Sequence, residues 1–131
     1  MQLIQRNDPH QHAQDLPPAE NDVSTGYMGD CACAIVMWNP DHNGRYLHVR
    51  GYHGGGGLGN VNFASLFAGV PNLVTTRIYM VSGTLQNSFY AIDTNRTEMR
   101  NAAIANGLGN AYLRCNHGYS IAAIDRNGNI T

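Results

Sequence analysis

The sequence predicts a single layered α/β domain with a mixed β-sheet and two or three helices. Its length of 131 residues suits one domain with one hydrophobic core. Several short apolar runs have the length of strands and are bounded by glycine, proline or asparagine. Between two of these runs lies a segment with helical spacing of apolar residues and with start and stop signals at its ends. Strands interleaved with helices in this way are typical of α/β layered domains.

The first half of the predicted domain is organised around a β-hairpin. Residues 1–22 are polar without periodicity, which predicts a flexible N-terminal tail before a domain over 23–131. Residues 31–38 form a continuous apolar run suited to a buried strand. One proline, two asparagines and a glycine in 39–44 predict a turn. We therefore expect 45–52 to return as the neighbouring strand.

The second half alternates between helix and strand signals. Residues 60–68 are expected to form a short helix, ended by the glycine and proline that follow it. Thr94 is a suitable N-cap for a longer helix over 95–106, which Gly107 would end. Further strands are predicted from apolar and β-branched content at 75–81, 111–115 and 120–125.

Charge and hydropathy exclude two classes of partner. The formal net charge is −1 and no basic run is present, so the chain has no electrostatic footprint for nucleic acid. No apolar stretch approaches the roughly 20 residues that a membrane-spanning helix needs, and residues 1–6 lack the apolar core of a signal peptide. All eight basic residues are arginine. That bias reflects either codon usage or selection against lysine modification inside a eukaryotic host cell.

The cysteines and one histidine supply the candidate chemistry. Three cysteines, Cys31, Cys33 and Cys115, do not suit a disulfide framework, which favours an even number, and indicate reduced thiols. Cys31 lies six residues after Thr25 and seventeen before His48. A thiol, an imidazole that takes its proton and a hydroxyl that orients the imidazole are the parts of a cysteine nucleophile.

The predicted hairpin tests whether Cys31 and His48 can meet. If 39–44 is the turn, residue 38 lies opposite 45, and Cys31 and His48 then share a face of the sheet. Four residues still separate them along a regular ladder, about 13 Å at about 3.3 Å per residue. Contact would require a bend at Gly29–Cys31. Cys33 lies nearer to His48 in this register, so the spacing leaves both thiols as candidate nucleophiles.

The stretch from Thr25 to His48 resembles the nucleophile region of bacterial protein-glutamine deamidases of the chemoreceptor-deamidase (CheD) type. Those proteins carry a threonine, a turn that ends in cysteine, an apolar strand, a second turn and a histidine. Thr25, Cys31 and His48 match the family's catalytic residues in order and spacing. The segments at 76–83, 95–106 and 125–128 are similar to later parts of the family pattern. The Cys–His layout also resembles that of the cytotoxic necrotizing factors, toxins that deamidate a glutamine in host GTPases.

The resemblance implies a deamidase fold over 23–131 and a hydrolase that converts a protein glutamine to glutamate. Cys31 would form the thioester, His48 would be the general acid and base, and the Thr25 hydroxyl would hold the His48 ring. The other residues expected to bind substrate or oxyanion are Asp30, Gly29 and His53. No cofactor and no metal are implied.

The expected partner is a protein with an exposed glutamine. It would be a chemoreceptor in the bacterial cytoplasm, or a host protein reached by an effector secreted without a signal peptide. Two other functions fit the same residues. One is a catalytically silent member of this fold that binds a protein. The other is a zinc site built from Cys31, Cys33, Cys115 and either His48 or His53, although typical zinc pairs are spaced Cys-x₂₋₄-Cys.

Overall fold

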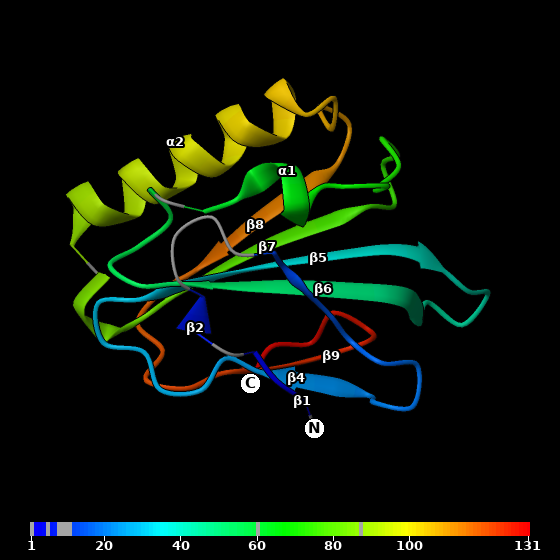
Figure 1. Ribbon diagram of the computed structural model, residues 1–131, viewed down its shortest axis with the longest axis horizontal. Helices are drawn as coiled ribbons and strands as arrows, with labels where there is room; N and C mark the ends of the chain where they lie inside the picture. The colour runs from blue at the N-terminus through cyan, green and yellow to red at the C-terminus, as the bar shows by residue number, and fades with distance from the viewer. Residues whose placement is uncertain (1, 5, 8–11, 60, 87) are drawn as a thin grey trace.

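The computed structural model describes residues 2–4, 6–7, 12–59, 61–86 and 88–131. The chain forms three layers (Figure 1), with helices α1 and α2 on one face of a six-stranded sheet and a three-stranded sheet on the other. Both parallel and antiparallel pairs occur in the six-stranded sheet. The predicted α/β class with a mixed sheet and two helices is therefore confirmed.

The six-stranded sheet is built around an antiparallel hairpin of β5 (Ala32–Pro40) and β6 (Tyr46–Gly54). On the other side of β5 lies β7 (Arg77–Ser82), followed by β8 (Tyr112–Asn116), which runs parallel to β7. The crossover from β7 to β8 contains α2 (Phe89–Ala105), as a parallel pair requires. All strands that the sequence predicted here are present, with shifted ends.

Each face of β5 is covered by a different layer, so the whole strand is apolar. Alternate residues of β5 share a core with α1 and α2, on what we term the helix face: Ala32, Ala34, Val36 and Trp38. The intervening residues share a core with the three-stranded sheet, on the opposite face: Cys31, Cys33, Ile35 and Met37. A strand buried on both sides loses the alternation of polar and apolar residues.

Both helices differ in extent from the prediction. Helix α2 begins at Ser88, whose hydroxyl accepts a hydrogen bond from the Ala91 N–H at 3.2 Å. The predicted start at Thr94 was wrong, because the first turn of α2 is exposed and has no buried apolar face. Helix α1 (Phe63–Leu66) is a single turn capped by Asn62. Position 60 of the predicted helix lies outside the described residues.

The N-terminal segment is part of the fold. Its described residues contribute four short strands: β1 (Gln2–Leu3), β2 (Arg6–Asn7), β3 (Gln14–Asp15) and β4 (Asp22–Ser24). β2 and β3 pair with β6, whereas β1 and β4 join β9 (Ala123–Asp125) in the three-stranded sheet. Ile4 and Leu16 are buried. The prediction of a flexible tail over 1–22 was therefore wrong for these residues; positions 1, 5 and 8–11 lie outside them.

Neither helix in the described part of the chain combines the length and apolar character that crossing a membrane requires.

Candidate functional site

The register of the β5–β6 hairpin determines which histidine lies near Cys31. Trp38 pairs with His48 and Cys33 pairs with His53, whereas the sequence predicted residue 38 opposite 45. The loop consists of the five residues 41–45, because Pro40 still pairs with Tyr46. The predicted loop had six residues, whereas the observed loop has five. This odd change in loop length moves each side chain of β6 to the opposite face of the sheet from the one predicted.

Aspartate 41 fixes the shorter loop. One Asp41 carboxylate oxygen accepts hydrogen bonds from the backbone N–H groups of Asn43 at 2.8 Å and Arg45 at 3.0 Å. These hydrogen bonds lower the pKa of Asp41, so the carboxylate is ionised at neutral pH. This Asx-type turn closes a loop over 41–45. The loop begins two residues later and ends one residue later than the predicted turn over 39–44.

The structure does not place His48 with Cys31. His48 lies on the helix face, but its side chain is exposed. Its ring stacks on Trp38 with a centroid separation of 5.0 Å and an interplanar angle of 14°. Its partner Trp38 is seven residues from Cys31, which corresponds to about 23 Å along the strand. The predicted Cys31–His48 pair was therefore wrong, because the register puts the two residues on opposite faces.

His53 takes the place that the sequence gave to His48. Cys31 lies at a bend just before β5, as predicted, and on the same face as Cys33. His53 is the cross-strand partner of Cys33, so Cys31 and His53 are diagonal neighbours with Cα atoms about 7–8 Å apart. Both side chains are buried, with 6% of Cys31 and 4% of His53 exposed. The register therefore brings Cys31 and His53 to neighbouring positions on one face of the hairpin.

A backbone carbonyl orients the His53 ring. Nδ1 of His53 lies 2.9 Å from the carbonyl oxygen of Thr25. Because a carbonyl only accepts hydrogen bonds, Nδ1 carries the proton, and Nε2 of the neutral ring is the basic atom. The side chain of Thr25 has another role, since its hydroxyl donates to the Gly26 carbonyl and accepts from the Ala122 N–H. Thr25 is thus at the site, but through its backbone and not through the predicted hydroxyl.

The turn that carries Cys31 is held by β7 and the residues after it. The Gly29 carbonyl accepts a hydrogen bond from Leu85 N–H at 2.9 Å, and the Cys31 carbonyl accepts one from Gly83 N–H at 2.8 Å. A Cβ on Gly83 would overlap the Gly29 carbonyl and the Met28 backbone, so only glycine allows this approach. The Gly29 carbonyl is thus a fixed point of the turn, held by Leu85 and packed against Gly83.

Asp30 is exposed and directly contacts the Cys31 thiol. The Cys31 thiol donates a hydrogen bond to Asp30 Oδ1, with Sγ 3.6 Å from the carboxylate oxygen. A carboxylate at this distance favours the protonated thiol over the thiolate through like-charge repulsion.

Cys33 is set apart from Cys31 by its burial. Cys33 is completely buried, and burial, with the nearby Cys31 as the smaller cause, raises its pKa far above the usual value of a thiol. Its thiolate is therefore absent at neutral pH. Of the two thiols that the sequence left open, Cys33 is therefore poorly suited to act as a nucleophile.

Alkylation of the native protein should distinguish the thiols. We expect iodoacetamide at about pH 7 to modify Cys31 about tenfold or more faster than Cys33, because only the thiolate reacts and burial keeps Cys33 protonated. Peptide mass spectrometry of samples quenched at successive times gives both rates. In urea the two rates should converge. Preferential modification of Cys33 in the native protein would rule out this assignment.

A second polar pair lies next to this turn and was not expected from the sequence. The Ser82 hydroxyl is 2.8 Å from Nδ1 of His117, where β7 and β8 end. Burial, and secondarily Arg96, lowers the pKa of His117, so its ring is neutral at pH 7. Ser82 is completely buried. The pair joins the loop after β8 to the Cys31 turn through Gly83, the residue after Ser82.

The zinc hypothesis fails on geometry. Within residues 2–4, 6–7, 12–59, 61–86 and 88–131, no three His, Cys, Asp or Glu side chains converge as metal ligands. His48 lies far from Cys31, and Cys115 belongs to β8, on the far side of β7 from Cys33.

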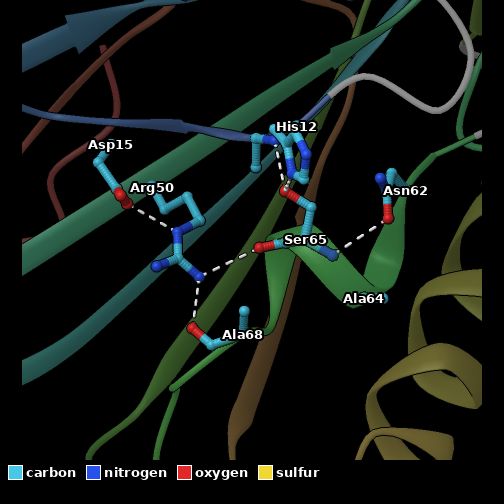
Figure 2. Close-up of a pocket in the computed structure, with 8 residues that line it drawn as sticks. His12, Asp15, Arg50, Asn62, Ala64, Ser65 and Ala68 are labelled. Atoms are coloured by element: carbon cyan, nitrogen blue, oxygen red, sulfur yellow. Dashed lines mark hydrogen bonds and ion pairs between the residues drawn. The ribbon is translucent and has the colours of Figure 1, made fainter.

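The hollow over β6 has a structural role (Figure 2). It encloses about 560 Å³, and its central residue is Arg50. The Arg50 guanidinium donates to Asp15 at 2.7 Å and to the carbonyls that end α1, including that of Ala68 at 2.7 Å. The Ser65 hydroxyl accepts the Ala13 N–H at 2.7 Å. These contacts attach the N-terminal segment to α1 and β6.

An exposed apolar patch surrounds the Cys31 turn. Its members come from the loop before Cys31 and from the segment that leads into α2, and they are 73–88% exposed: Tyr27, Leu85, Phe89 and Tyr90. The Leu85 N–H bond to Gly29 joins the two segments. Exposed aromatic and leucine side chains are a feature of surfaces that bind other proteins.

Comparison of the chain with protein-family models, curated proteins and solved structures gave no match.

Proposed function

We propose that this chain is a protein-glutamine deamidase in which Cys31 is the nucleophile and His53 is the general acid and base. The observation that carries the proposal is the arrangement of three groups. The Cys31 thiol and the His53 ring lie on one face at the end of the hairpin, and the Thr25 carbonyl fixes the proton on His53 Nδ1. A nucleophile, a base and a group that orients the base are the parts of covalent catalysis.

The reaction follows from these roles. His53 Nε2 takes the Cys31 proton, and the thiolate attacks the side-chain carboxamide carbon of a glutamine. Backbone N–H groups at the Cys31 turn stabilise the tetrahedral oxyanion. The C–N bond then breaks, and ammonia leaves with the proton from His53. Water, deprotonated by His53, hydrolyses the thioester to glutamate and regenerates the Cys31 thiol. No cofactor takes part in this scheme.

A protein is the substrate that the surroundings of Cys31 favour. The exposed side chains of Tyr27, Leu85, Phe89 and Tyr90 present apolar surface beside the site. A free amino acid would cover little of it, whereas a folded partner with an exposed glutamine would bury it. We extend the proposal to the deamidase fold of the chemoreceptor and necrotizing-factor type, acting on a target in the bacterial cytoplasm or in a host cell.

Conversion of glutamine in cell lysates tests the proposal. Wild-type protein and the Cys31→Ala variant are incubated separately with bacterial and with animal-cell lysates. We expect glutamine-to-glutamate conversion at discrete sites, together with ammonia release, only with wild-type protein. The lysate that contains the converted protein tells a bacterial target from a host target. Absence of Cys31-dependent conversion in both lysates would refute the deamidase.

One observation favours a silent binding module as a second candidate. The Cys31 thiol donates a hydrogen bond to the Asp30 carboxylate, and this contact favours the protonated, unreactive thiol. If the protein only binds its partner, the same lysates should yield a retained protein without conversion. The Cys31→Ala variant should then retain it equally well.

A further inference from the structure

The β5–β6 ladder stops immediately before the candidate nucleophile. Its last pair is Ala32 with Gly54. In the same register, Cys31 would face Gly55 and Asp30 would face Gly56, but these residues do not pair. The chain after Gly54 instead folds back, so that a Cβ on Gly54 would overlap the Gly57 carbonyl. The two strands therefore separate at Cys31.

A side chain bridges the separated strands. Nε2 of Gln86 donates to the Asp30 carbonyl at 2.6 Å and to the Gly56 carbonyl at 3.3 Å. In a continued ladder Asp30 and Gly56 would form the pair after Cys31 and Gly55. Both acceptors are carbonyls, so the amide nitrogen of Gln86 must face them. The bridge replaces a main-chain pair and leaves Cys31 between it and the end of the ladder.

The other end of the Gln86 amide is anchored in α2. Oε1 of Gln86 accepts a hydrogen bond from Nδ2 of Asn95 at 3.2 Å. Asn95 is only 5% exposed and is one of three buried residues of α2. A buried amide with a fixed position limits the rotamers of Gln86, so the bridge is tied to the helix layer.

We infer that Gln86 is a positioning residue that holds the Cys31 turn at a fixed separation from His53, an inference that rests on the proposed Cys31–His53 pair. Gln86 acts through the backbone on both sides of the site. It fixes the residue before Cys31 and the glycine segment that follows His53. It reaches neither the thiol nor the imidazole. Small displacements of reacting groups lower rates strongly, so loss of the bridge should lower reactivity without unfolding the protein.

The test compares two Gln86 variants by the alkylation rate of Cys31. Gln86→Met removes both donors without adding charge, and Gln86→Glu keeps the acceptor for Asn95 but cannot donate to carbonyls. Iodoacetamide rates are measured at about pH 7, where the thiolate depends on His53, and at about pH 10, where an ordinary thiol is ionised. The rate at about pH 7 divided by the rate at about pH 10 separates activation of the thiol by His53 from access of the reagent to Cys31. Asn101→Met, on the exposed side of α2, is the matched control.

We expect both Gln86 variants to lower this ratio about tenfold and Asn101→Met to leave it unchanged, with circular dichroism showing folded protein throughout. A ratio lowered only in Gln86→Glu would be a charge effect and would overturn the inference, as would wild-type ratios in both variants. Ammonia release is measured in parallel. If wild-type protein releases none while the ratios change as expected, the deamidase proposal fails and the positioning role stands.

Discussion

Substitution of His53 by glutamine is expected to lower Cys31-dependent glutamine conversion about 10²–10⁴-fold, the usual contribution of a general acid–base residue. Glutamine can still donate to the Thr25 carbonyl but has no basic nitrogen to accept the Cys31 proton. The rate of ammonia release with the target protein measures the loss. The iodoacetamide rate of Cys31 at neutral pH should decrease in parallel, because both reactions need the thiolate.

His48→Gln is the matched control for this prediction. His48 is exposed and stacks on Trp38, far from Cys31 along the strand. Its substitution should leave conversion and alkylation within about twofold of wild type, as expected for a surface position away from the chemistry. The reverse pattern, with His48 required and His53 dispensable, would contradict the hairpin register on which the site is built.

The choice of histidine shows where the sequence stops being informative. The apolar run over 31–38 located β5, and the turn signal after it located β6 as the returning strand. The pairing of these strands depends on whether the loop has five or six residues. That difference rests on the hydrogen bonds of Asp41, which no periodicity reveals. The predicted register was wrong by three residues, and because this number is odd, the prediction put His48 on the wrong face of the sheet.

The bend beside Cys31 was predictable, whereas the contacts that hold it were not. The bend at Gly29–Cys31 follows from local residues and the resemblance. Gln86 is separated from Asp30 by 56 positions and reaches it only because β7 lies beside β5. The N-terminal segment was misjudged for a similar reason. Its strands have two or three residues each, too short for any hydrophobic pattern to show.

Arg126→Met should destabilise the fold by about 3–5 kcal/mol, as removal of one partner from a buried charged network does. Arg126 is only 2% exposed, and its guanidinium donates to four backbone carbonyls: those of Pro17, Glu20, Tyr46 and Leu47. Methionine fills similar space but removes the guanidinium donor from these carbonyls, of which that of Pro17 keeps the Glu20 N–H; a buried carbonyl left without a donor costs about 1–3 kcal/mol. Urea unfolding followed by circular dichroism measures the change.

Arg77→Met is the control, because Arg77 donates only to the Val74 carbonyl and its guanidinium lies over the ring of Tyr112. It should cost less than about 1 kcal/mol, since exposed contacts of this kind contribute little. Equal losses in the two variants would contradict a special role for Arg126. The four carbonyls belong to the N-terminal segment and to the start of β6. Arg126 therefore joins a segment that resembles a tail in sequence to the hairpin that carries Cys31 and His53, and its loss should also increase hydrogen exchange in 12–24.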